Sequence, residues 1–88
     1  MPYIKAVDRP AIAQKAQELS DVINTDGELN YAITVLIHRY VKRHNLCYGT
    51  LNLVMGVLDC VAKEFYRRVV APYEDKKIKE NTDIGLLQ

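Results

Sequence analysis

An all-α fold is predicted for this chain of 88 residues: a small bundle of three main helices plus a short C-terminal fourth, completed by oligomerisation. Apolar side chains recur at spacings of three and four residues, as on one face of a helix. No stretch shows the alternating pattern of a strand. The composition, 49% hydrophobic and 26% charged, is that of a folded soluble protein. We expect a single helical domain over residues 1–80 and a C-terminal tail over 81–88.

The first predicted helix begins at Asp8-Arg9-Pro10, with the Asp8 carboxylate as N-cap and Pro10 in the first turn. Asn24 to Gly27 should end it. Its apolar positions are Ala13, Ala16, Leu19, Val22 and Ile23.

The second predicted helix is capped by Asp26 and ends in a basic last turn, where cations suit the helix dipole. Residues 45–49 form the following loop. The apolar stripe is Leu29, Ile33, Leu36, Ile37, Tyr40 and Val41, and the basic set is Arg39, Lys42, Arg43 and His44.

The third predicted helix runs from about Thr50 to Val70, with Glu64 and Arg68 spaced to pair. Its first half is apolar over a wide arc, which indicates burial against more than one neighbour. We therefore expect self-association through residues 50–70; the alternative is that the first helix covers this arc within one chain. Pro72 should break the helix and start the short fourth one.

The composition and charge make several classes of function unlikely. A net charge of +1 makes nucleic acid an unlikely partner, and no apolar run is long enough to span a membrane. Cys47 and Cys60 are expected to be free thiols in a reducing, cytoplasmic setting. No cofactor, metal site or catalytic residue is predicted. Ser20 reads as a helix surface residue, and Glu18 with Asp21 lacks the second acidic pair that a magnesium-dependent hydrolase needs.

Two clusters are candidate ligand sites. In the larger one, tyrosine rings would stack on a ring-bearing ligand while cations meet its phosphates. The alternative is a packing seam with charged ends reaching solvent. The smaller cluster lies in the first turn of the second predicted helix. The alternative is that its residues cap the helix and pack against neighbours. The larger comprises Tyr66, Arg67, Arg68, Tyr73, Lys76 and Lys77, and the smaller Asn30 and Tyr31.

Three motifs carry a family resemblance: MPYI at residues 1–4, GELNYAIT at 27–34 and EFYRRVVAPYEDKKI at 64–78. With them the chain resembles a family of small uncharacterised helical proteins of bacteria and their phages. The family commonly has Gly-Asp-Val after the Glu-Asn pair, where this chain has Thr82-Asp83-Ile84. The resemblance implies a setting in which small proteins bind partners or counter host defence, and no transferable activity.

The leading hypothesis is a non-catalytic, homo-oligomeric binding protein that holds or sequesters an anionic nucleotide-like ligand near subunit interfaces. The first alternative is an adaptor or inhibitor that binds a host protein through the same surface. The second is a small magnesium-dependent nucleotide hydrolase built on the acidic residues.

Overall fold

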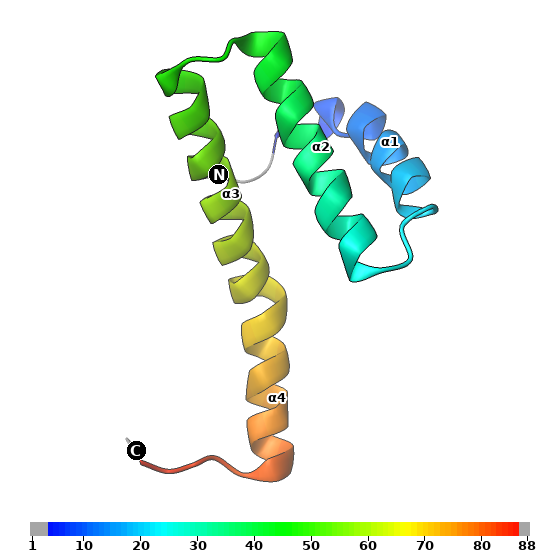
Figure 1. The fold of residues 1–88 in the computed structure, drawn as a ribbon. Coiled ribbons are helices and arrows are strands. Elements are labelled where there is room, and N and C mark those ends of the chain that lie inside the picture. Colours follow the sequence, from blue (N-terminus) through cyan, green and yellow to red (C-terminus); the bar gives the residue numbers. More distant parts are fainter. Residues whose placement is uncertain (1–3, 87–88) are drawn as a thin grey trace. The chain divides into compact units, whose positions relative to one another are not determined.

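The computed structural model describes residues 4–86, and within that range the chain is helical with no strand (Figure 1). The all-α class, with three main helices and a short fourth, is confirmed. Residues 1–3 of the first family motif and residues 87–88 of the predicted tail lie outside the described range. The elements are a 3₁₀ turn Ala6–Asp8, α1 Pro10–Ser20, α2 Asp26–His44, α3 Tyr48–Phe65, a π-helical segment Tyr66–Val70 and α4 Ala71–Asn81.

Helix α1 begins at Pro10 as predicted, but its N-cap is Arg9. The prediction of Asp8 as N-cap is wrong, because Asp8 closes the preceding 3₁₀ turn: its N–H donates to the Lys5 carbonyl at 2.9 Å. The helix ends at Ser20, earlier than expected.

Helix α2 is capped by Thr25, so the prediction of Asp26 as cap is also wrong. Thr25 Oγ1 accepts from the Glu28 N–H at 3.1 Å, and Glu28 Oε1 accepts from the Thr25 N–H at 3.1 Å. This reciprocal capping box satisfies the backbone N–H groups of both Thr25 and Glu28. The basic last turn, with Lys42, Arg43 and His44, is confirmed.

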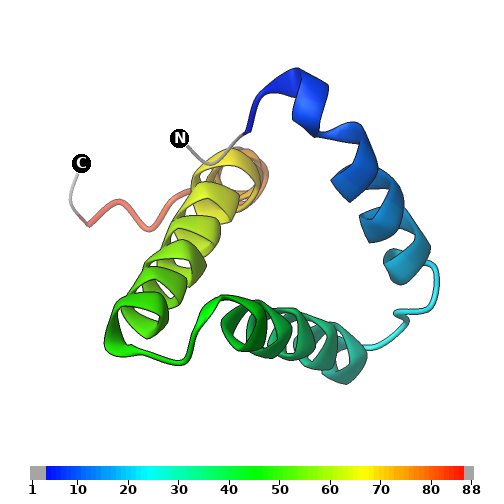
Figure 2. The ribbon, with the colours of Figure 1, turned by 90° about the horizontal axis from the view of Figure 1, so that it is seen from above.

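Short connections join the helices of the first half. Residues 21–25 link α1 to α2, and residues 45–47 link α2 to α3, which begins at Tyr48 rather than after Gly49 (Figure 2). Leu51 N–H donates to the Cys47 carbonyl at 3.0 Å, so Cys47 stands at the N-cap of α3.

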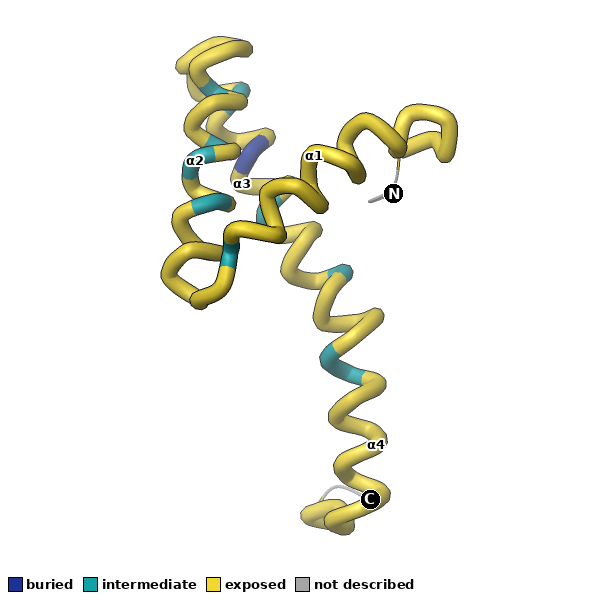
Figure 3. The backbone as a smooth tube through the Cα atoms, turned by 90° about the vertical axis from the view of Figure 1, so that its right-hand side faces the viewer, coloured by how far each residue is buried: buried dark blue, intermediate teal, exposed yellow. Residues whose placement is uncertain are grey.

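The chain divides into two compact units, Met1–Met55 and Gly56–Gln88. Val54, in the first unit, is the one buried apolar side chain among residues 4–86, at 9% exposure (Figure 3). Ile37 and Val41 of α2 and Thr50 of α3 are half-buried. The second unit consists of the end of α3, the π-helical segment and α4, which form a single line of helix.

Pro72 does not break the chain's helical path, which corrects the sequence prediction. The residues around it, Phe65, Val70 and Ala71, all keep right-handed helical angles. The turn before Pro72 is widened instead: the Ala71 N–H donates to the Tyr66 carbonyl, five residues back. A proline clashes with the carbonyl four residues back in an α-helix. The π-helical segment changes that spacing just before Pro72, the second residue of α4.

Helix α4 ends at Asn81, and Thr82 follows with φ 66° and ψ 152°. This backbone region is almost restricted to glycine, and a β-branched residue there is strained. A glycine at this position would adopt it freely.

We predict that Thr82→Gly stabilises the end of α4 by about 1 kcal/mol, by relieving this strain. Amide hydrogen exchange over the last turn of α4 should then slow about fivefold. Thr82→Ala is the matched control, because it removes the hydroxyl and keeps the Cβ atom. Equal exchange in the glycine and alanine variants would contradict the prediction.

Candidate binding surfaces

Tyr66 of the predicted ligand cluster is held by a carboxylate. Its hydroxyl donates to Glu74 Oε1 at 2.9 Å, eight residues along the chain. This hydrogen bond, with the charges of Glu74 and Asp75, raises the pKa of Tyr66 above its ordinary value. At neutral pH the hydroxyl is protonated, as in an ordinary tyrosine, and can donate this bond.

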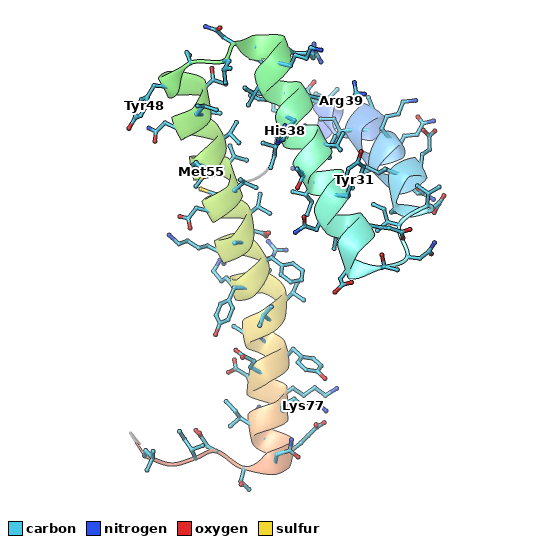
Figure 4. The ribbon with its side chains drawn as sticks, viewed as in Figure 1. Tyr31, His38, Arg39, Tyr48, Met55 and Lys77 are labelled. Atoms are coloured by element: carbon cyan, nitrogen blue, oxygen red, sulfur yellow. The ribbon has the colours of Figure 1, made fainter. Side chains whose placement is uncertain are left out.

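The other aromatic member, Tyr73, lies beneath a lysine. Lys77, which Figure 4 labels on α4, has its Nζ 5.6 Å from the Tyr73 ring centroid, a cation–π contact, and 3.1 Å from Glu80 Oε2. A surface hollow of about 590 Å³ brings Tyr66, Tyr73 and Lys77 together. Its remaining lining residues are Ala71, Glu74, Asp75, Ile78 and Thr82. Two carboxylates thus share the hollow with one lysine.

The remaining members of the larger cluster, Arg67, Arg68 and Lys76, are not among the residues that line this hollow. Arg68 Nε lies 3.9 Å from Glu64 Oε1, which confirms the predicted pairing of those two residues. Arg67 and Arg68 follow Tyr66 in the π-helical segment, and neither lines the hollow that Tyr66 and Tyr73 share.

The two residues of the smaller cluster, Asn30 and Tyr31, do not line the same groove either. Tyr31 is 71% exposed and lines a groove of about 720 Å³ in the first unit, whereas Asn30 does not line it. The backbone carbonyl of Asn30 accepts a hydrogen bond from Thr34 Oγ1 at 2.8 Å. Tyr31 and Arg39 are labelled on α2 in Figure 4.

This groove is the feature that the sequence interpretation missed. The end of α1 and the turn after it supply Leu19, Val22 and Ile23, and α2 supplies the facing side. A signal was present in the sequence, because both helices carry apolar stripes. The α2 side consists of Thr25, Gly27, Glu28, Tyr31, Ala32, Val35, Leu36 and Arg39.

Both cysteines are free and exposed. Cys47 Sγ lies 3.4 Å from Thr50 Oγ1, at the start of α3. Hydrogen bonding to the Thr50 side chain and backbone lowers the pKa of Cys47 below its ordinary value. Cys47 is thus favoured as a thiolate relative to an ordinary exposed cysteine.

The acidic residues of the hydrolase alternative remain scattered. Glu18 pairs with Lys15 at 3.5 Å on α1. Within the described residues, no group of three or more His, Cys, Asp and Glu side chains is placed to hold a metal ion. The helices described over 4–86 also include none with the length and apolar character needed to cross a membrane.

We predict that Cys47 reacts faster than Cys60 with iodoacetamide at neutral pH, because its thiolate is stabilised at a helix start. Thr50→Val should slow the reaction of Cys47 and leave that of Cys60 unchanged. Peptide mass spectrometry during alkylation of the native protein measures both rates in one sample. An unchanged Cys47 rate in Thr50→Val would refute the role of the hydroxyl.

We further predict that Glu74→Gln lowers the pKa of Tyr66 towards its ordinary value of about 10. Because the native pKa is raised, the hydrogen bond contributes fully below about pH 10 and is lost as pH rises through the native pKa. Ring-carbon NMR of Tyr66 during a pH titration measures this shift. Glu80→Gln removes a nearby carboxylate that does not bond Tyr66 and should leave its titration as in the native chain.

The comparisons with known proteins give one family match. No curated protein and no solved structure matches the chain. Residues 1–84 match the family described as Domain of unknown function (DUF6899). Because that match covers nearly the whole sequence, this all-helical chain belongs to the DUF6899 family.

Proposed function

We propose that the protein is a non-catalytic binding protein that acts as a homo-oligomer, with its apolar helix faces covered by further copies of the same chain. Its primary ligands are then polypeptides rather than small molecules. The proposal is supported chiefly by the apolar side chains that each unit leaves exposed.

Little apolar surface is covered within either unit. Among residues 4–86, Val54 is the one buried apolar side chain. Large apolar side chains on α1, on α2 and along the second unit are exposed, among them Ile12, Leu29 and Phe65. A chain of this kind gains stability from covering those side chains with protein.

One group of these exposed apolar side chains lines a groove. In the first unit, Leu36 is 58% exposed and Val22 is 66% exposed, and both line the α1–α2 groove. Exposed apolar patches of this kind mark protein interaction sites. A groove between two helices suits an amphipathic helix laid into it.

An anionic, nucleotide-like ligand has weaker support. Glu74 and Asp75 line the same hollow as Tyr66, Tyr73 and Lys77, so a phosphate entering it would meet two carboxylates. The Lys77 charge is shared with Glu80, and the Tyr66 hydroxyl is occupied by Glu74. The geometry therefore favours polypeptide partners over an anion at this place.

Light scattering coupled to size exclusion, over a range of micromolar concentrations, tests the proposal. We expect a mass that is a multiple of 10.1 kDa and an unfolding midpoint, followed by circular dichroism, that rises with protein concentration. If the chain folds and associates in one linked process, both the multiple mass and the concentration-dependent midpoint should be observed.

The other outcomes separate the alternatives. A 10.1 kDa monomer with a cooperative, concentration-independent transition would refute the proposal. A monomer without cooperative unfolding would favour a different protein as the partner. Calorimetric titration with cyclic and linear nucleotides should give no heat of binding, and saturable binding would restore the anionic ligand as the leading hypothesis.

A further inference from the structure

The α1–α2 groove is continued along α2 by a second hollow of about 450 Å³. The groove and the hollow share a row of α2 residues four positions apart, and such a row forms one ridge of a helix. Figure 4 labels the two ends of this row, Tyr31 and Arg39, on α2. The groove and the hollow therefore form one continuous surface of the first unit, here the α2 surface. The shared residues are Tyr31, Val35 and Arg39, and the hollow adds Thr34, His38 and Lys42.

The groove end of the α2 surface is apolar. Ala32 and Val35 of α2 are half-buried in it, while Leu36 keeps 58% of its surface exposed. From Gly27 to Arg39 the groove follows α2 for about 18 Å, or about three helical turns. A helix laid along it would cover these side chains over that whole length, which removes apolar area from water.

The other end of the α2 surface is cationic. Arg39 lines both the groove and the hollow, and Lys42 lines the hollow. Among residues 4–86, neither of these two side chains takes part in an ion pair. None of the described residues that line the hollow is acidic. Unpaired cations beside an apolar groove favour an acidic partner, because opposite charges attract it and basic partners are repelled.

The one carboxylate of the α2 surface is at its far end and is already in use. Glu28 Oε1 accepts from the Asn24 N–H at 2.6 Å and from the Thr25 N–H at 3.1 Å, as part of the capping box. Along the helix axis Glu28 is about 16 Å from Arg39. This carboxylate therefore leaves the cations at the other end without a counter-charge.

We propose that the α2 surface binds an amphipathic helix of another protein, with the apolar face of that helix in the groove and acidic residues near one of its ends over Arg39 and Lys42. Apolar contact supplies most of the attraction, and charge sets the direction in which the helix lies. The inference goes beyond the proposed homo-oligomer, because it assigns this surface to a different chain and leaves the other apolar faces to further copies.

The helices of this chain do not match the α2 surface in charge. Helices α1 and α4 carry equal numbers of acidic and basic residues, and α2 has a net positive charge. The two acids of α3 are paired on their own helix line, since Lys63 Nζ lies 2.7 Å from Asp59 Oδ2 and Arg68 Nε lies 3.9 Å from Glu64 Oε1. An acidic helix from a different protein is thus a better fit than a second copy.

A pair of designed peptides tests the charge preference on the native chain. The probe is a fluorescein-labelled helix of about 18 residues, since shorter ones are marginally stable in water. It has leucines at three- and four-residue spacing and several glutamates near one end, and the control peptide has glutamine at those positions. By fluorescence anisotropy we expect saturable binding of the glutamate peptide, about tenfold tighter than the control, with a difference that shrinks as salt is added. Absence of binding, or equal binding of the two peptides, would overturn the inference and would leave the homo-oligomer to its own test by mass.

Two charge reversals locate the acidic end of the peptide. Arg39→Glu changes the α2 surface, whereas Lys15→Glu changes the net charge equally at a residue of α1 that lines neither the groove nor the hollow. We expect Arg39→Glu to weaken binding of the glutamate peptide about tenfold and Lys15→Glu to leave it within about twofold. Equal weakening by both variants would overturn the inference, because it would show attraction to the whole chain rather than to this surface.

Two leucine truncations test the apolar end and remain informative if Arg39→Glu loses helix content. Leu36 and Leu29 are both exposed on α2, at 58% and 51%, but only Leu36 lines the groove. We expect Leu36→Ala to weaken peptide binding about tenfold and Leu29→Ala to leave it unchanged. A fluorescein-labelled DNA duplex that binds more tightly than the peptide, and equally well to Leu36→Ala and the native chain, would overturn the inference in favour of a nucleic acid.

Discussion

The need to cover apolar helix faces is the constraint on which the rest of this structure depends. A helix that stands in a single layer cannot bury its own apolar side. The second unit is such a layer, and among the described residues of the first unit only Val54 is buried. The exposed apolar side chains and the α1–α2 groove are both consequences of that shortfall. The proposed association would supply the missing layer.

Local sequence signals were enough to predict the fold class and most helix positions. Pro10 at the start of α1 and the basic end of α2 depend only on nearby backbone groups, and both are where they were expected. The two cap predictions failed because several residues compete for one helix start. Thr25 outcompeted Asp26, since it forms a reciprocal pair with Glu28. Such competition depends on backbone angles that composition does not specify.

The candidate ligand site was predictable only in part. Residues adjacent in sequence look like a cluster, but on a helix they point in different directions. Tyr66, Tyr73 and Lys77 do share a hollow, whereas Arg67, Arg68 and Lys76 do not line it. The α1–α2 groove was missed for the opposite reason. It is formed by residues far apart in sequence, from Leu19 to Arg39, that only the turn between two helices brings together.

Pro72 connects two of these observations. The wider turn before it keeps the helical path unbroken, since the Ala71 N–H donates to the Tyr66 carbonyl five residues back. The same turn lies between Tyr66 and Glu74, whose side chains bond at 2.9 Å across eight positions. Residues eight apart in a plain α-helix diverge by about 80°, so this bond is formed across the widened turn. A proline that should have ended the helix instead lies beside the turn that brings these two side chains together.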